Sequence, residues 1–434
     1  NVGAVIGQVT NDGKVDNCHV LSGKVTGTGD HVGGLLGYSE YFGGVRNSSN
    51  AAAISGVSFV GGISGGAYGS NCVNTGTVTG TGNYVGGIYG SLGTDTGSTS
   101  GNENYGAVIG KNYVGGVTGS GGQANSYNEG NITGEKNVGG ISGSFSLFEG
   151  TSDQCVNKGS VNGVENVGGI CGTTGNRCHI SGATNEGYVT GEQYVGGIAG
   201  SFGGALSGKA RNLINCKNTA EVTGKAYVGG ILGYNSGSSK NPITGNINEA
   251  DITGEDKVAG IVAYNNNAIV TNNTNSGNIS GYTNLGQIVG EQNASYTPDI
   301  VTGNISNGTV TILENNDFAR IVNGTKVSYI VYTLKGFEAW SEEVHKATLG
   351  TDGERYVVNL DLRADITLPD PAEGQEGNWT PIGNYANTGG WSHANSYKGV
   401  IEGNGHKISN MIIVSGGVSG FIGYIEKGTV RNLS

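Results

Sequence analysis

The sequence predicts an all-β fold: a right-handed parallel β-helix, or β-solenoid, with coils of about 28 residues, followed by the helix-capped start of a second β-helix. Three observations support this expectation. Glycine makes up 85 of the 434 residues, far above the ordinary share of about 7 %. A short glycine-containing block recurs along the first two thirds of the chain. The composition then changes near residue 300, and all three tryptophans lie beyond that point.

The repeat is a block of the form Val-Gly-Gly-Ile-x-Gly that returns every 24–33 residues. Its copies begin at Val2, Val32, Val60, Val85, Val114, Val138, Val167, Val195, Val228, Val258 and Leu285. Paired glycines and β-branched residues oppose helix and favour short strands separated by turns. A repeat of this length with three short strands matches one coil of a parallel solenoid, in which equivalent positions stack about 4.8 Å apart. We therefore expect each sequence column to form a ladder.

Two apolar columns are expected to fill the solenoid interior. The first contains the Val and Ile of the glycine block. The second precedes Thr-Gly, or a variant of it, in a phrase of the form Asn-x-Gly-x-Val-Thr-Gly. It comprises Val25, Ile54, Val78, Val108, Ile132, Val161, Val189, Val222, Ile252 and Ile279.

The asparagine of the same phrase forms a third column. Its members are Asn50, Asn74, Asn104, Asn128, Asn157, Asn185, Asn218, Asn248 and Asn275. Stacked amides can hydrogen-bond to the coils above and below them. We therefore predict a structural asparagine ladder that lines a turn and performs no chemistry.

A candidate ligand-contact stripe precedes the glycine blocks. Its aromatic members are His31, Phe59, Tyr84, Tyr113, Tyr194 and Tyr227, with Asn137 and Asn166 in the middle. Because the following Val is expected to point inward, these side chains are expected to point outward. Aromatic stripes can stack against sugar rings or anchor a protein partner. The alternative interpretation is that the rings stabilise neighbouring strands by stacking on one another.

The sequence predicts three segments. Residues 1–305 form the repeat solenoid, residues 306–332 supply closing strands and a connector, and residues 333–434 contain a cap helix and the first coils of a second, truncated β-helix. The helix is expected to begin after an N-cap at Thr333, to place Leu334, Phe337, Trp340, Val344 and Ala347 on one face, and to stop at Gly350. Such a helix is suited to cover the open end of a solenoid.

These phrases resemble the GLUG repeat of bacterial surface proteins. The resemblance rests on Val-Gly-Gly-Ile-x-Gly followed by Asn-Cys-x-Asn-x-Gly-x-Val-Thr-Gly. It rests also on Trp379-Thr-Pro-Ile-Gly and Gly403-Asn-Gly-His-Lys-Ile-Ser-Asn, which are similar to the opening coil of such arrays. It covers residues 1–290 and 330–434. It implies secreted or wall-attached proteins, such as adhesins and the regions that flank metallo-type immunoglobulin A proteases. It implies no catalytic residues for the repeats.

A search for chemical motifs yields no catalytic, metal or cofactor site. The nearest match to a zinc-protease helix is Glu342-Glu343-Val344-His345, which has one histidine and no partner. Cys72, Cys155 and Cys216 share one position of the repeat, as does Cys18 with one inserted residue. They fall on non-adjacent coils, so we expect buried thiols rather than disulfides. Glu221 and Asp251 form a carboxylate pair on adjacent coils, the one arrangement with the spacing of a retaining glycosidase.

Net charge and hydropathy limit the classes of partner that the chain could bind. The net charge of −11 disfavours nucleic acid, and no apolar run is long enough to insert into a membrane. We expect a non-catalytic, extracellular or cell-surface bacterial module for structure and adhesion, whose partner is a host or microbial surface protein or glycan. The alternative is an accessory β-helix of a secreted protease or glycan-active enzyme whose catalytic domain lies outside this chain. The chain opens and stops within the repeat pattern, which indicates a fragment of a longer protein.

Overall fold

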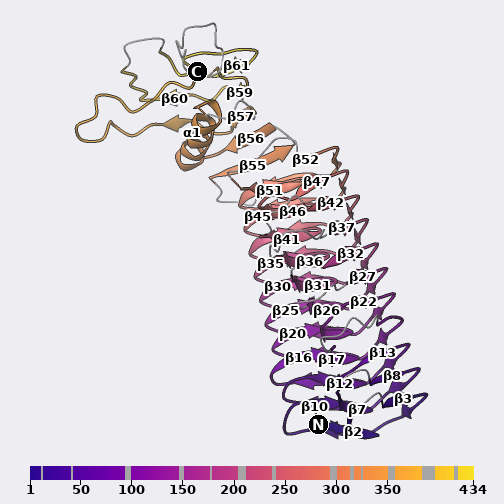
Figure 1. The fold of residues 1–434 in the computed structure, drawn as a ribbon. Helices are drawn as coiled ribbons and strands as arrows, with labels where there is room; N and C mark the ends of the chain where they lie inside the picture. The colour runs from indigo at the N-terminus through magenta and orange to yellow at the C-terminus, as the bar shows by residue number, and fades with distance from the viewer. Residues whose placement is uncertain are drawn as a thin grey trace.

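The chain forms a stack of parallel coils that leads into a smaller second β unit (Figure 1). The computed structural model describes residues 1–10, 13–40, 43–92, 99–145, 151–175, 178–203, 212–236, 241–293, 301–312, 317–323, 326–349, 357–383, 396–414 and 419–434. The predicted β-solenoid is confirmed. Each coil carries up to five short strands rather than the expected three, because strands of two residues leave little trace in composition. Eleven coils at about 4.8 Å give a rod about 50 Å long.

Each wall of the solenoid is a parallel sheet of strands from successive coils. Sheet 1 holds the start of the glycine block: β1 (Val2–Gly3), β6 (Val32–Gly33), β11 (Val60–Gly61), β16 (Asn83–Gly86), β20 (Asn112–Gly115), β25 (Lys136–Gly139), β30 (Glu165–Gly168), β35 (Gln193–Gly196), β40 (Ala226–Gly229), β45 (Asp256–Ala259) and β50 (Thr283–Gly286). Sheet 2 follows it in each coil: β2 (Ile6–Val9), β7 (Leu36–Ser39), β12 (Ser64–Gly66), β17 (Tyr89–Ser91), β21 (Thr118–Ser120), β26 (Ser142–Phe145), β31 (Cys171–Thr174), β36 (Ala199–Phe202), β41 (Leu232–Asn235), β46 (Val262–Asn265) and β51 (Val289–Gln292).

The third wall is divided into a three-stranded and a seven-stranded sheet. Its strands are β3 (Lys14–Asp16), β8 (Gly44–Arg46) and β13 (Tyr68–Ser70), then β22 (Gln123–Ala124), β27 (Thr151–Asp153), β32 (His179–Ser181), β37 (Asn212–Ile214), β42 (Pro242–Thr244), β47 (Ile269–Thr271) and β52 (Val301–Thr302).

Sheets 4 and 5 complete the coil. Sheet 4 carries the asparagine column: β4 (His19–Val20), β9 (Ser49–Asn50), β14 (Val73–Asn74), β18 (Glu103–Asn104), β23 (Tyr127–Asn128), β28 (Val156–Asn157), β33 (Thr184–Asn185), β38 (Lys217–Asn218), β43 (Ile247–Asn248), β48 (Thr274–Asn275) and β53 (Ile305–Ser306). Sheet 5 carries the second apolar column: β5 (Lys24–Thr26), β10 (Ala53–Gly56), β15 (Val78–Gly80), β19 (Val108–Ile109), β24 (Ile132–Thr133), β29 (Val161–Asn162), β34 (Val189–Thr190), β39 (Val222–Thr223), β44 (Ile252–Thr253), β49 (Ile279–Gly281) and β54 (Val310–Ile312).

The two predicted apolar columns pair in the expected register. The first residues of all eleven glycine blocks stack in sheet 1, and Val25 through Ile279 stack in sheet 5. From Val32 to Leu285 the sheet 1 column is buried, and it packs with the sheet 5 column in one apolar cluster. Val2 and Val25 belong to the first coil and are more exposed. The Ile of the block fills a second cluster on the other side of the coil.

The asparagine column is a continuous side-chain ladder. From Asn50 to Asn248, each Nδ2 donates to the Oδ1 of the asparagine in the next coil, at 2.7–2.9 Å. The same Nδ2 donates to the backbone carbonyl two residues further on, as Asn157 does to Gly159 at 2.8 Å. The side chains are at most 1 % exposed. The column is therefore a buried structural element, and the prediction of its geometry is confirmed.

The ladder explains one of the repeated glycines. A Cβ at Gly140, the second glycine of its block, would lie 2.3 Å from Cγ of Asn157 in the same coil. The same clash would recur in the other blocks that carry this glycine. In the last block Gln287 stands at this position, and its Oε1 accepts from Asn275 Nδ2 at 2.8 Å. The ladder position of that coil is occupied by Ser306 instead of asparagine. Gln287, which belongs to the glycine-block column, therefore supplies the last acceptor of the ladder.

The hairpin β55 (Phe318–Asn323) and β56 (Lys326–Val331) joins the solenoid to the second unit. β55 pairs antiparallel with β51 and with β56, after which β57 (Val357–Leu362), β59 (Val400–Glu402) and β61 (Thr429–Arg431) continue sheet 2 in parallel. A second small sheet pairs β58 (Ile366–Thr367) with β60 (Ile408–Ser409). Sheet 2 therefore runs without a break from the first coil into the second unit (Figure 1).

The predicted helix is α1 (Leu334–Leu349). Thr333 caps it, since the Gly336 backbone N–H donates to Thr333 Oγ1 at 3.3 Å. Phe337, Trp340, Val344 and Ala347 are buried as expected, and the expected stop at Gly350 lies outside the described residues. These side chains belong to the core of the second unit, with β56, β57 and β58, rather than to the two solenoid clusters. The helix therefore covers the start of the second core, not the end of the first.

A partly buried ion pair connects the helix to the hairpin. Arg320 on β55 donates from Nε and Nη2 to Glu343 on α1 at 2.7 and 2.6 Å, and the Tyr329 hydroxyl on β56 also donates to Glu343. Arg320 Nη1 reaches the Gly290 carbonyl of β51 at 3.4 Å. Desolvation and the neighbouring Glu343 carboxylate raise the pKa of Tyr329. These contacts join β51, the hairpin and the helix.

Candidate functional site

The stripe residues lie at a left-handed corner of every coil after the first. His31, Phe59, Tyr84, Tyr113, Tyr194 and Tyr227 have φ between 52° and 60°, and so do Asn137, Asn166, Lys257 and Asn284 in the same column. All six aromatic side chains are half-buried. The expectation that the stripe side chains point outward was based on the alternation of side chains along a strand. A residue with left-handed backbone geometry does not follow that alternation. The rings lie beside the outer side of sheet 2, partly covered by their neighbours.

A second left-handed corner shows why the aromatic column is unusual. That corner precedes the cysteine position and is occupied by Asn or Gly in all coils except one, where Gln154 stands. Asn and Gly adopt positive φ at little cost, whereas other residues lose about 1–2 kcal/mol. The stripe instead places large rings where the backbone favours Asn or Gly. Side-chain contacts must therefore offset the backbone cost at these positions.

Four rings near the N-terminal end of the stripe form a parallel stack. Centroids of His31 and Phe59, of Phe59 and Tyr84, and of Tyr84 and Tyr113 lie 4.6, 4.8 and 4.8 Å apart, with interplanar angles of 5°, 13° and 9°. Tyr38 packs against His31 at 4.6 Å. The ring spacing equals the coil spacing, so each inner ring has a neighbour on both faces. For the inner rings Phe59 and Tyr84, only ring edges remain for a partner, which favours the stabilising interpretation for these two residues.

The middle of the stripe carries amides instead of rings. Asn166 Nδ2 donates to Asn137 Oδ1 at 3.0 Å. This amide-to-amide bond is similar to a step of the ladder, but here the later coil donates to the earlier one. The pair divides the aromatic column into two groups. The structure therefore does not bring the six predicted aromatic residues into one continuous stack.

The second group is a cluster of four tyrosines: Tyr194, Tyr227, Tyr234 and Tyr264. Tyr194 lies 5.0 Å from Tyr227 and 4.7 Å from Tyr234, at 48° and 43°. Tyr227 stands nearly perpendicular to Tyr234 and Tyr264, at 90° and 77°. Tyr234 and Tyr264 stack at 5.1 Å. We call this group the tyrosine cluster. Its rings are tilted relative to one another, except that Tyr234 and Tyr264 are nearly parallel.

Tyr234 and Tyr264 were not among the predicted site residues. Each lies on sheet 2, in register with Ser201 and with Glu291 in the coils on either side. Each follows a stripe position by seven residues, and Tyr38 follows His31 by the same interval. This spacing is visible in the sequence. It becomes informative only once the left-handed corner is known to bring the two columns together.

An ionic group borders the tyrosine cluster. Lys257 occupies the stripe position after Tyr227, and its Nζ lies 5.0 Å from the Tyr227 ring centroid. That ammonium also contacts Asp256 at 2.6 Å and Glu291 at 3.2 Å. Burial alone would lower the pKa of Lys257, but the two carboxylates outweigh it and raise the pKa to about 12. The lysine is thus charged and already paired with acids.

Other predicted groups lie apart from the stripe. Glu221 and Asp251 are exposed and lie immediately before the paired strands β39 and β44. Asp251 Oδ1 accepts from the backbone and side chain of Asn278 at 2.8 and 3.0 Å. The six cysteines, all within described segments, form no disulfide. Cys18 stands two residues before Val20, which occupies the ladder position, so the expected one-residue insertion is wrong. Within the described segments, no cluster of three or more His, Cys, Asp or Glu side chains is arranged to hold a metal ion.

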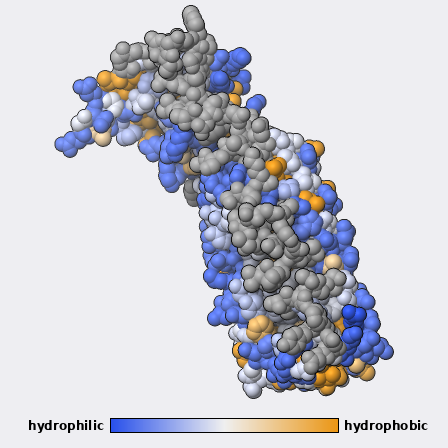
Figure 2. All heavy atoms as spheres, viewed as in Figure 1, coloured by the Kyte–Doolittle hydropathy of each residue, from blue (hydrophilic) through white to orange (hydrophobic). Residues whose placement is uncertain are grey.

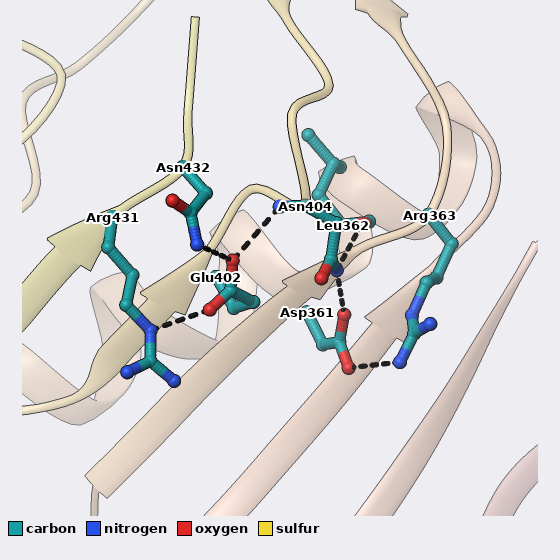
Figure 3. A network of polar contacts seen from close by, with 7 residues as sticks. All are labelled: Asp361, Leu362, Arg363, Glu402, Asn404, Arg431 and Asn432. Atoms are coloured by element: carbon teal, nitrogen blue, oxygen red, sulfur yellow. Dashed lines mark hydrogen bonds and ion pairs between the residues drawn. The ribbon is translucent and has the colours of Figure 1, made fainter.

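The second unit has its own polar surface network (Figure 3). Asp361, Glu402 and Arg431 are in register on β57, β59 and β61. Glu402 accepts from Arg431 Nε at 2.6 Å and from Asn432 Nδ2 at 2.9 Å, and hydrogen bonds from Asn432 and the Asn404 backbone lower its pKa. Asn404 Nδ2 donates to Asp361 Oδ1 at 2.5 Å. Because these contacts join successive strands, we interpret the network as strand bridging.

Among the residues coloured by hydropathy in Figure 2, hydrophilic ones predominate and hydrophobic ones form small separate groups. None of the described helical residues forms a span long and apolar enough to cross a bilayer. Comparison of the chain with protein-family models, curated protein sequences and solved structures finds no match. The resemblance to GLUG repeats and the functional expectations based on it therefore stay predictions.

Proposed function

We propose that this chain is a non-catalytic module of an extracellular bacterial surface protein that presents a binding surface along a rigid rod. One observation carries the proposal: an aromatic column is held at one corner of a solenoid whose register is unbroken over eleven coils. The apolar clusters and the asparagine ladder fix that register, so every stripe residue lies at the equivalent corner of its coil. The partner is a host or microbial surface protein or glycan.

The backbone at the stripe supports a role beyond packing. Asn137 and Asn166 show that the fold accepts asparagine at this corner, with less backbone strain than an aromatic residue. Six coils nevertheless carry aromatic rings there. Half-exposed rings at strained positions are typical of surfaces kept for recognition. The resemblance to bacterial surface repeats is consistent with this interpretation.

The test is binding of the fluorescently labelled chain to epithelial and bacterial cells, measured by flow cytometry. We expect saturable binding that unlabelled chain displaces. The matched control replaces all six stripe aromatics with asparagine, the residue that the column already carries, and its folding is checked by circular dichroism. We expect the folded control to lose saturable binding. Absence of saturable binding by the parent chain, or equal binding by the control, would overturn the proposal.

A further inference from the structure

We propose that coils 5 and 6, which begin at Val114 and Val138, form a one-sided hinge in the rod. The side of these coils between sheet 2 and the third wall opens locally, while the side that carries the asparagine ladder keeps its register. This inference concerns the rod itself and goes beyond the proposed binding function.

Two columns face the interior on the side that opens, one on sheet 2 and one on the third wall. In coils 2, 9, 10 and 11 both positions are apolar: Leu36 with Val45, Leu232 with Ile243, Val262 with Val270, and Val289 with Val301. In coil 5 the same positions carry Thr118 and Gln123. In coil 6 they carry Ser142 and Ser152. Two successive coils therefore bury polar side chains on both walls.

The apolar cluster on this side has few members in coil 5. All residues of coil 5 are described, and only Val117 of them belongs to that cluster. Coil 8 supplies five members: Ile198, Ala199, Phe202, Leu213 and Cys216. Coil 3 has Ser64 and Gly69 at the two positions, but a Cβ at Gly69 would lie 2.3 Å from the hydroxyl of the buried Tyr89, so that ring fills the space. Because burial of apolar surface is the main stabilising contribution, local opening is expected first at coil 5.

The polar side chains of these two coils are incompletely paired. Gln123 Oε1 accepts from Asn102 Nδ2 at 3.0 Å, whereas the buried Gln123 Nε2 has no hydrogen-bond partner among the described residues. The buried Ser152 hydroxyl lies beside the Cys155 thiol, which is a weak hydrogen-bond partner. In an open state water would pair with both groups, so their burial favours opening.

Backbone pairing differs between the two sides of the coil. On the third wall, β22 is the terminal strand of the seven-stranded sheet, and the preceding coil reaches it by one isolated bridge from Ser100 to Ala124. On the other side sheets 1, 4 and 5 continue through both coils, and Asn128 Nδ2 donates to Asn157 Oδ1 at 2.7 Å. Val114 and Val138 are buried there in the second apolar cluster. Loss of contacts on one side, with the other side intact, bends a rod rather than breaking it.

Cys155 and Cys216 are matched reporters of this opening. They occupy the same position of coils 6 and 8, both are buried, and burial raises the pKa of each thiol to about 12. The Cys155 thiol donates to the Gln123 carbonyl at 3.3 Å, so it lies at the proposed opening. The full chain is incubated with iodoacetamide at pH 8 without denaturant, and labelling of each cysteine is followed by mass spectrometry. After correction for the labelling rates in concentrated guanidinium, we expect Cys155 to react at least about tenfold faster than Cys216.

A double variant tests the cause. Ser142→Ala with Ser152→Leu gives coil 6 the residues that coil 8 carries in the same columns, Ala199 and Leu213. Its folding is checked by circular dichroism. The double variant should slow the labelling of Cys155 at least about tenfold and leave that of Cys216 within about twofold.

Hydrogen exchange of the parent chain tests the one-sidedness without any variant. Backbone amides of β22 and β27 should exchange faster than those of β24 and β29, which lie on sheet 5 in the same two coils. Equal labelling of Cys155 and Cys216 in the parent, unchanged labelling of Cys155 in the folded double variant, or equal exchange on both sides of coils 5 and 6 would overturn the hinge.

Discussion

Replacing Asn157 with alanine removes one step of the buried ladder. Asn157 accepts from Asn128 Nδ2 at 2.7 Å and donates to Asn185 Oδ1 and the Gly159 carbonyl, each at 2.8 Å. After the substitution, a donor hydrogen of Asn128 and the acceptors on Asn185 and Gly159 lose this partner in a fully buried environment. Each unsatisfied buried group costs about 1–3 kcal/mol, so we expect a loss of about 3 kcal/mol in the free energy of unfolding.

The assay is guanidinium-induced unfolding followed by circular dichroism, together with hydrogen exchange to locate the weakened coils. Asn162→Ala in the same coil is the control, because that side chain is exposed, and it should change the free energy by less than about 0.5 kcal/mol. The double variant Asn128→Ala with Asn157→Ala should cost less than the sum of the single variants by about 1 kcal/mol, because the two residues share one hydrogen bond. A loss equal to that of Asn162→Ala, or additive costs in the double variant, would refute the ladder energetics. Loss of cell binding by a variant as stable as the parent would show that the ladder does more than hold the fold.

Two further predictions concern titratable groups. Burial raises the pKa of Cys155 and of Cys216 to about 12, so iodoacetamide at pH 8 should label the half-exposed Cys18 well before either of them. Mass spectrometry without reduction should find six thiols. A Cys72–Cys155 bridge would contradict the coil assignment. Burial lowers the pKa of His31 below its ordinary value of 6.5. The unfolded chain therefore binds a proton at this residue more readily than the folded chain does. The stability contributed by neutral His31 is complete above pH 6.5 and is lost as pH falls through the lowered pKa. His31→Asn should remove this part of the pH dependence in thermal unfolding scans, and an unchanged pH profile would contradict it.

The sequence determined the solenoid and its register because every coil repeats the same physical requirement. The column from Val32 to Leu285 had to be buried, since β-branched residues between glycines recur at a spacing that fits stacked strands. The asparagine ladder followed from the same periodicity, because identical amides on a parallel stack meet their own kind in the next coil. The helix after Thr333 was likewise visible in the spacing of Phe337 and Trp340.

Tertiary structure decided what periodicity alone does not encode. Gln287 ends the ladder because it reaches Asn275 from the opposite wall, a contact between different sequence columns. The helix serves the second core because β56 and β57 provide the matching apolar surface. The stripe separates into a parallel ring stack and a cluster of tilted tyrosines, because left-handed corners bring it beside sheet 2, where Tyr234 and Tyr264 replace small residues. Sequence columns predict which residues stack, but backbone geometry determines which columns touch.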